Sequence, residues 1–281
     1  MKYQSSYLKF GLAVFLVFSL VGCKCFKNRK ANKEKPIELG VGLSFNESYN
    51  VKERKRQTAS LFYERLVQRG PSSYSLMALS SNLGGFIAMY EATDSLKYLD
   101  EAMGIVNAVL TKAKVVRLVE GNKSRFTDNY KGFVNINPDM KNRRGGPDME
   151  EVPLYESYFY RYVAKLLYVY SKSSNSVRTS NRDKEFNYAL AFLKTNGWEK
   201  WYKRGEEKGD CYVYMFRSRT HMTSHWAMVA LFLNELDTDK GKQIQYSTFM
   251  DLYNNQVREN LKINSVDAYV WNMTWDKNWP M

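Results

Sequence analysis

The chain contains only two histidines, which lie four residues apart at His221 and His225. This spacing places both rings on one face of a helix. A histidine has an ordinary pKa of about 6.5, so His225 could exchange protons close to neutral pH. Hydrolytic zinc motifs with this spacing carry a Glu between the histidines, which this chain lacks, so we expect no metal site. The alternative is a histidine that forms local hydrogen bonds, with the adjacent Trp226 in the core.

A charged segment over residues 139–156 offers groups that bind anions and groups that cleave sugars. Arg143 and Arg144 precede two glycines, and guanidinium groups suit bidentate recognition of a carboxylate or a sulfate. Glycoside hydrolysis needs two carboxylates about 5 to 9.5 Å apart, and the acids that follow are Asp148, Glu150, Glu151 and Glu156. Glu156 stands at the start of a mostly apolar helix, which favours an interior role. The alternative is a solvated loop whose last acids are favoured by the helix dipole.

The C-terminal segment interleaves aromatic residues with polar ones. Residues 267–279 read DAYVWNMTWDKNW. Tyr269, Trp271 and Trp275 could stack on sugar rings, and Asp276 could accept hydrogen bonds from sugar hydroxyls. The alternative is core packing against a neighbouring helix. Residues 126–133 form a shorter segment of the same kind.

Composition narrows the class of protein. Of 281 residues, 44 % are hydrophobic, 25 % are charged and 15 % are aromatic, which excludes global disorder. Lys and Arg outnumber Asp and Glu by 42 to 29, a formal charge of +13. Such a charge suits nucleic acid, an anionic membrane surface or an acidic polysaccharide. Only one apolar run is long, so a polytopic membrane protein is excluded.

That apolar run, residues 10–21, is shorter than the roughly 20 residues of a membrane-spanning helix but suits a signal peptide. It ends at Leu20-Val21-Gly22-Cys23, which resembles the lipobox of bacterial lipoproteins. The resemblance implies that the Cys23 thiol receives a lipid and that the chain is cut before it. Loss of the two lysines in residues 1–22 would lower the formal charge from +13 to +11. The alternative is an ordinary signal peptide or anchor with a chance cysteine.

The lipoprotein resemblance also implies an organisation and a location. Residues 1–22 are the signal peptide, residues 23–50 a basic flexible tether, and residues 51–281 the folded domain. The tether either lies along anionic headgroups or is only a soluble spacer. The residue after Cys23 is Lys24 and not Asp, which favours the outer membrane in well-studied lipoproteins. We therefore expect a lipid-anchored protein of the bacterial cell envelope that does not bind nucleic acid. A disulfide between Cys25 and Cys211 is not expected, because Cys25 lies so close to the anchor.

Apolar periodicity predicts helices in the folded domain over residues 52–69, 76–92, 95–112, 154–170, 183–194, 224–236 and 246–261. Residues 115–146 are expected to be mostly irregular. The helix over residues 154–170 is apolar nearly all round, as expected of a buried inner helix. Gly84 and Gly85 are expected to allow a close helix contact or a bend. We expect helical hairpins around Thr93, near residues 172–183 and around Asp237.

Three segments repeat one plan, in which an apolar helix, a polar turn and a half-exposed helix follow one another. Residues 88–102 read AMYEATDSLKYLDEA, residues 231–239 read LFLNELDTD, and residues 167–189 form a looser copy. In this plan the chain resembles the (α/α) toroid carbohydrate-active enzymes, which include glycoside hydrolases and polysaccharide lyases. The resemblance implies an all-α toroid of helical hairpins. A complete ring is longer than this chain, so we expect an incomplete ring or a truncated sequence.

The toroid resemblance further implies a lyase or a glycoside hydrolase that acts on an acidic polysaccharide without a cofactor. In such lyases a histidine takes the proton next to a uronate carboxyl and a tyrosine protonates the leaving oxygen. His225 and Tyr269 are the candidates for these roles, and Glu156 is the candidate catalytic carboxylate. The substrate-binding candidates are expected to converge on one face: Arg143, Arg144, Trp226, Trp271, Trp275 and Asp276. The alternative is a non-catalytic glycan-binding or scaffold lipoprotein.

Overall fold

The computed structural model describes residues 72–136, 148–216, 220–260, 262–263 and 269–270. The chain divides into two units, Met1–Arg56 and Gln57–Met281, and every described residue belongs to the second. For Thr220, for residues 258–260 and for strands β3 (Lys262–Ile263) and β4 (Tyr269–Val270), the description covers the backbone.

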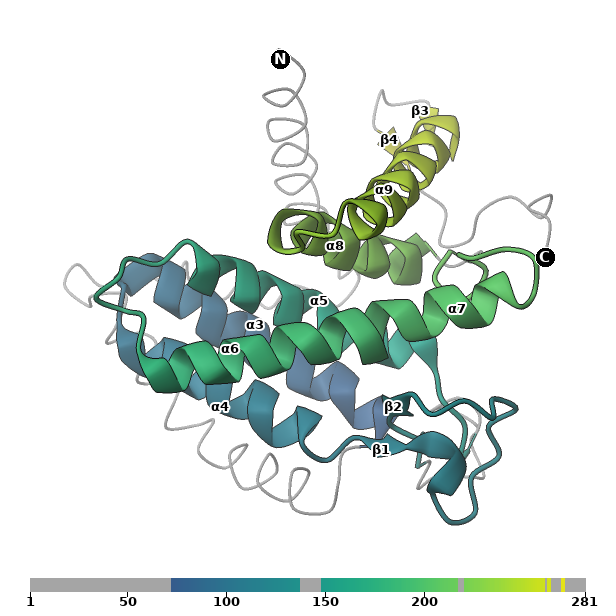
Figure 1. Ribbon diagram of the computed structural model, residues 1–281. Helices are drawn as coiled ribbons and strands as arrows, with labels where there is room; N and C mark the ends of the chain where they lie inside the picture. Colours follow the sequence, from purple (N-terminus) through teal and green to yellow (C-terminus); the bar gives the residue numbers. More distant parts are fainter. Residues whose placement is uncertain (1–71, 137–147, 217–219, 261, 264–268, 271–281) are drawn as a thin grey trace, which may run out of the picture. The chain divides into compact units, whose positions relative to one another are not determined.

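Helices make up most of the described residues (Figure 1), so the expected all-α fold is confirmed. The elements of the first half are α3 (Ser73–Thr93), α4 (Leu96–Leu110), β1 (Lys114–Val115), η1 (Val116–Leu118) and β2 (Lys131–Gly132). Those of the second half are α5 (Pro153–Ser171), α6 (Ser180–Phe192), the π-helix η2 (Leu193–Glu199), α7 (Lys200–Glu206), α8 (Thr220–Leu236) and α9 (Lys240–Asn260). Strand β1 pairs with β2 and β3 with β4, both antiparallel. Within the described residues, no helix is long and apolar enough to cross a membrane.

The three expected hairpins are confirmed, as α3–α4, α5–α6 and α8–α9. Each turn is made by a residue suited to it. Asp94 ends α3 with a φ of 53°, in the left-handed region that Asp tolerates better than most residues. Thr179 accepts a hydrogen bond from the backbone N–H of Arg182 at the start of α6. Asp239 likewise accepts from the N–H of Gly241 at the start of α9.

The first helices of the three hairpins, α3, α5 and α8, pack in a row with α5 in the middle. Contacts between α3 and α5 keep the same order along both helices. Tyr74 meets Tyr155 near the two N-termini, with 5.3 Å between ring centroids. The hydroxyl of Tyr90 lies 3.1 Å from Ser173 Oγ near the two C-termini. Helices α3 and α5 are therefore parallel.

Helices α5 and α8 are parallel for the same reason. Tyr158 meets His225 in the first half of each helix, and Tyr168 meets Phe232 in the second half. The buried side chains of α5 include Phe159, Tyr160 and residues 163–164, in agreement with the expected inner helix. A row of parallel first helices is what a segment of an (α/α) toroid would contain, while closure into a ring stays a prediction.

A close contact at Gly84 sets the spacing of α3 and α5. A Cβ atom at this position would lie 2.7 Å from the ring of Tyr162, so only glycine allows the ring to rest on the α3 backbone. Helix α3 runs unbroken through Gly84 and Gly85. The close-contact prediction is therefore confirmed, and no break in the helix accompanies it.

Helices α6 and α7 are joined by η2 into one continuous helical run (Figure 1), although the sequence predicted a helix ending at residue 194. The hydrogen bonds of a π-helix skip one residue more than those of an α-helix, so a π segment rotates the faces that follow it. In η2 the fully buried Trp198 packs on α9, with its ring centroid 5.0 Å from that of Tyr246 and 5.5 Å from that of Phe249. Helix α7 then presents Lys200, Trp201 and Arg204 to the interior.

Candidate functional site

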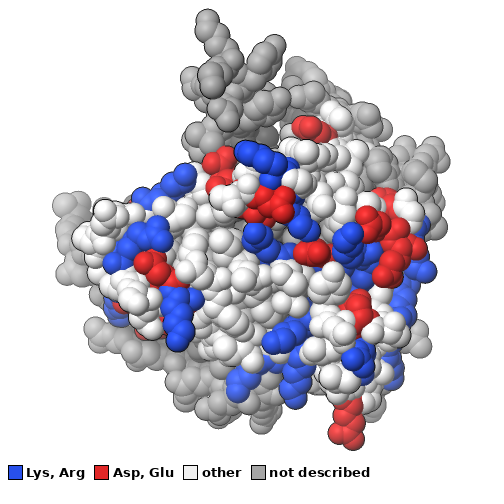
Figure 2. Space-filling view, in the orientation of Figure 1, with Lys and Arg blue, Asp and Glu red and all other residues white. Residues whose placement is uncertain are grey.

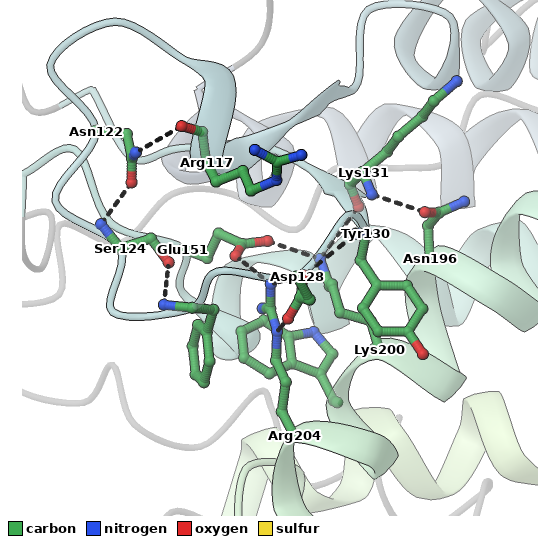
Figure 3. Close-up of polar contacts among 12 residues, drawn as sticks. Arg117, Asn122, Ser124, Asp128, Tyr130, Lys131, Glu151, Asn196, Lys200 and Arg204 are labelled. Carbon is green, nitrogen blue, oxygen red and sulfur yellow. Dashed lines mark hydrogen bonds and ion pairs between the residues drawn. The ribbon is translucent and has the colours of Figure 1, made fainter.

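The buried ionic cluster is defined here as Asp128, Glu151, Glu156, Lys200 and Arg204, and Glu156 lies in the first turn of α5. Figure 3 shows four of its members, Asp128, Glu151, Lys200 and Arg204. Lys200 Nζ donates to Glu156 Oε1 at 2.8 Å and to Glu151 Oε1 at 3.0 Å, and none of these three side chains is exposed. The indole of Trp201 donates to the second oxygen of Glu156 at 2.8 Å. Both oxygens of Glu156 are therefore occupied by groups of α7.

Arg204 links the cluster to the loop before β2. It binds Asp128 through two nitrogens, Nε at 2.7 Å and Nη2 at 3.0 Å. The same Nη2 is 2.8 Å from Glu151 Oε2, close enough for an ion pair although the two atoms are not aligned for a hydrogen bond. The guanidinium group also stacks 3.9 Å from the ring centroid of Phe126. Arg204 thus combines a bidentate ion pair with a cation–π contact.

Two backbone features bring Glu151 to Lys200. An isolated antiparallel bridge joins Glu151 to Val134, directly after β2. Gly132 of β2 faces the cluster, and a Cβ atom there would collide with Glu151 Oε1 and lie 2.8 Å from Lys200 Nζ. The backbone N–H of Lys131 donates to Asn196 Oδ1 at 2.7 Å, and this hydrogen bond holds β2 against η2.

Charge within the buried ionic cluster is unequal, because three carboxylates face two basic groups. Burial raises the pKa of Glu156 above its ordinary value of 4.5, Lys200 opposes that change, and Glu151 adds to it. The interior position expected for Glu156 is confirmed. Both of its oxygens nevertheless accept hydrogen bonds from α7, so Glu156 helps to hold the helices together and is not open to a ligand.

His225 lies in the second turn of α8, because this helix begins at Thr220 and not at residue 224 as predicted. The imidazole is 5 % exposed, and its Nδ1 lies 3.3 Å from Ser157 Oγ. Burial, followed by the charges of Arg161 and His221, lowers the pKa of His225 to about 2. The expected pKa near 6.5 is therefore wrong, and the ring is neutral near pH 7.

Trp226 does not offer a face to a sugar. Its side chain is fully buried, between Tyr160 of α5 and Trp198 of η2. The alternative of a core tryptophan is thus the correct one, because the neighbouring helices cover both sides of the indole. The two histidine rings do share one helix face, with 6.2 Å between their centroids. Among the described residues, no group of three His, Cys, Asp or Glu is placed to hold a metal ion.

Most of the other candidates lie outside the described residues: Cys23, Arg143, Arg144, Trp271, Trp275 and Asp276. Tyr269 belongs to β4, whose backbone alone is described. Their convergence on one face with His225 therefore stays a prediction. Cys211 carries a free thiol.

A second group of polar and aromatic residues lies on the half-buried faces of α5 and α8. We call it the Arg161 patch and define it by Tyr158, Arg161, Tyr162 and His221, each of which is half-buried. The guanidinium carbon of Arg161 lies 4.5 Å from the ring centroid of Tyr162 and 5.5 Å from that of Tyr158. Tyr158 in turn lies 6.2 Å from the ring of His221. These side chains line the row of parallel helices on the side away from the buried face of α5.

Sequence reasoning did not select Arg161, Lys200 or Arg204. A signal for Arg161 was present, since it is one of two basic residues in the otherwise apolar stretch of residues 154–170. Lys200 and Arg204 are four residues apart and could have been recognised as one helix face. Their carboxylate partners, however, lie 44 to 76 residues away, and no local pattern identifies them.

The charge of the described domain differs from that of the whole chain. Residues 72–136, 148–216 and 220–260 contain equal numbers of basic and acidic residues, so the excess of +13 belongs to the remaining segments, above all to residues 1–71. On the face drawn in Figure 2, basic and acidic side chains are interspersed. Within these residues, any preference for an acidic ligand must therefore come from individual side chains.

These features define an all-α domain of helical hairpins with a buried ionic cluster and a half-buried arginine patch. Comparison of the chain with protein-family models, with curated proteins and with solved structures found no match.

Proposed function

We propose that this protein is a lipid-anchored protein of the bacterial envelope whose helical domain binds an acidic polysaccharide without cleaving it. One observation carries the choice of binding over catalysis. Glu156 and His225, two of the expected catalytic residues, are both committed to the interior, one in ion pairs and the other as a neutral ring. A general acid or base must reach the proton that it transfers.

The Arg161 patch supports the binding part of the proposal. Tyr158 and Tyr162 offer aromatic rings and hydroxyls on a surface that is partly open, and aromatic rings with a polar group suit sugars, which have apolar faces and hydroxyl edges. Arg161 lies between these rings and suits an acidic group.

The sequence motif at Cys23 supports the anchor. Several acyl chains attached there would give firm membrane binding, since each buried CH₂ contributes about 0.8 kcal/mol. The basic residues between Lys24 and Lys35 would add attraction to anionic headgroups. The Cys23→Ala variant should lose incorporation of labelled fatty acid and remain an uncleaved or soluble precursor. Unchanged labelling of this variant would overturn the lipoprotein assignment.

A polysaccharide lyase or hydrolase is the second candidate, favoured by the parallel row of α3, α5 and α8 that resembles the inner helices of toroid enzymes. One assay separates the two. The full chain, held in detergent, is incubated with polygalacturonate, and both sedimentation of the complex and ultraviolet absorbance of unsaturated products are followed. Binding without new absorbance or new reducing ends supports the binding protein. Product formation would favour the enzyme, and absence of binding to acidic and neutral polysaccharides alike would reject the proposed function.

A further inference from the structure

Arg161 is held in place by its neighbours. Two tyrosine rings contact its guanidinium group, at 4.5 Å for Tyr162 and 5.5 Å for Tyr158, and such cation–π contacts favour one orientation of the group. Tyr162 is fixed in turn, because its ring rests on the α3 backbone at Gly84. The site is therefore organised before any ligand arrives.

Within the described part of the chain, Arg161 forms no hydrogen bond or ion pair. Its Nε atom is buried without a partner. Burial lowers the pKa of Arg161, and the groups that oppose this change are the hydroxyls of Tyr162 and Tyr158, with no carboxylate among them. Arginine retains its charge in such an environment, so this cation has no counter-ion among the residues that the structure describes.

The first two turns of α8, residues 220–227, carry no acidic residue either. His225 lies beyond Tyr158, with 4.3 Å between ring centroids, and its pKa is lowered by burial and by the charge of Arg161. By contrast, Lys165 follows Arg161 by one turn of α5 and pairs with Glu91 at 2.7 Å. A half-buried cation that is unpaired among the described residues costs stability, and an external anion would supply its partner.

We propose that Arg161, together with the hydroxyls of Tyr158 and Tyr162, binds an anionic group of the glycan, either a carboxylate or a sulfate. This inference deepens the proposed function and rests on it for the identity of the ligand. The planar guanidinium group can donate two parallel hydrogen bonds to such an oxyanion. The tyrosine rings beside it would contact the sugar that carries the anion.

The test compares Arg161→Met with the matched control Lys165→Met, which removes the same charge from the same helix. Binding of a galacturonic acid hexamer and of a neutral glucose hexamer is measured by calorimetry on the full chain in detergent. We expect Arg161→Met to weaken binding of the acidic hexamer about tenfold or more, the effect of losing a charged hydrogen bond. Binding of the neutral hexamer should not change, and Lys165→Met should alter either affinity by less than about twofold.

A second measurement, of melting temperature, does not depend on the identity of the sugar. Sodium sulfate should raise the melting temperature of the wild-type chain relative to sodium chloride of equal ionic strength. This difference should be smaller in Arg161→Met and unchanged in Lys165→Met, because the general stabilisation by sulfate acts on all three proteins alike. In the absence of ligand, Arg161→Met should melt no lower than the wild type, because the variant no longer buries an unpaired donor.

The outcomes separate the two proposals. If neither hexamer binds but sulfate stabilises the wild type through Arg161, the proposed function fails and the anion site stands. If the acidic hexamer binds equally to the wild type and to Arg161→Met, the glycan binding stands and the anion site is overturned. A loss of binding to both hexamers together with a lower melting temperature would show that Arg161 has a structural role, and would also overturn the anion site.

Discussion

Lys200 Nζ lies 2.8 Å from Glu156 Oε1, and this ion pair joins the start of α7 to the first turn of α5 across 44 residues of sequence. Neither side chain is exposed, and the ammonium group is shared with Glu151 at 3.0 Å. Buried ion pairs add little net stability compared with apolar residues, but removing one partner leaves an uncompensated charge. The pair therefore fixes the position of α7 relative to α5 and accounts for the interior location of Glu156.

Replacement of Lys200 by Met should destabilise the protein strongly. The variant leaves Glu151 and Glu156 buried without their ammonium partner, and breaking a buried pair in this way costs about 3–5 kcal/mol. The free energy of unfolding in urea measures the loss. The control is Lys203→Met, three residues along α7, whose exposed pair with Glu206 should contribute little. Combining Lys200→Met with Glu156→Gln should restore part of the stability, and equal stability of Lys200→Met and wild type would contradict the ion-pair assignment.

Glu156 should make stability fall as the pH rises. Burial raises the pKa of Glu156 in the folded protein above the ordinary value of 4.5. Between pH 4.5 and this raised pKa, the folded state therefore binds more protons than the unfolded state. The stabilisation that Glu156 gives through this bound proton is complete below about pH 4.5, and it is lost as the pH rises through the pKa of the folded state. Urea titrations from pH 4.5 to 8 should show this decline in the wild type and a smaller one in Glu156→Gln. Glu91→Gln, a change at the surface, should follow the wild type; identical curves for all three proteins would refute the raised pKa.

His225 should act on stability in the opposite direction. Its pKa is about 2 in the folded protein against an ordinary 6.5, so below pH 6.5 the unfolded state binds the additional proton. Stability should fall by up to about 1.4 kcal/mol per pH unit below that value, and His225→Gln should remove this part of the slope. Nuclear magnetic resonance gives a direct check, because the chain has two histidines and the variant identifies the signals of His225. Titration of these signals near pH 6.5 would contradict the buried neutral ring.

Two glycines in helices should respond to Ala in opposite ways. At Gly84 the new Cβ would lie 2.7 Å from the Tyr162 ring, and overpacking of this kind costs about 1–3 kcal/mol. At Gly104 of α4 the new Cβ would meet no other atom within 4 Å, so Gly104→Ala should stabilise the protein by about 0.5–1 kcal/mol through its helix propensity. Thermal unfolding of the two variants measures both effects, and a stabilising Gly84→Ala would show that α3 and α5 have room to separate.

The hairpin turns were predictable because their chemistry is local. Asp94, Thr179 and Asp239 each act on backbone groups within a few residues, and the apolar periodicity on either side of them indicates helices. The continuation of α6 through η2 was missed, because Gly197 and the polar residues before it weaken the local helical pattern. Packing of Trp198 on α9 holds this segment helical, and that contact has no counterpart in the neighbouring sequence.

The sequence by itself determined the helices of the three hairpins, their pairing and the inner position of α5, since all three follow from periodicity and turn residues close together in the chain. The tertiary structure decided the roles of the charged and aromatic residues. It gave Glu156 a lysine partner 44 residues away and buried His225 and Trp226, while Arg161 received aromatic neighbours and no counter-ion from the described part of the chain. The physical reason is that ionisation and accessibility depend on the dielectric surroundings and on charges brought near by folding, whereas helix formation depends mainly on residues within one or two turns.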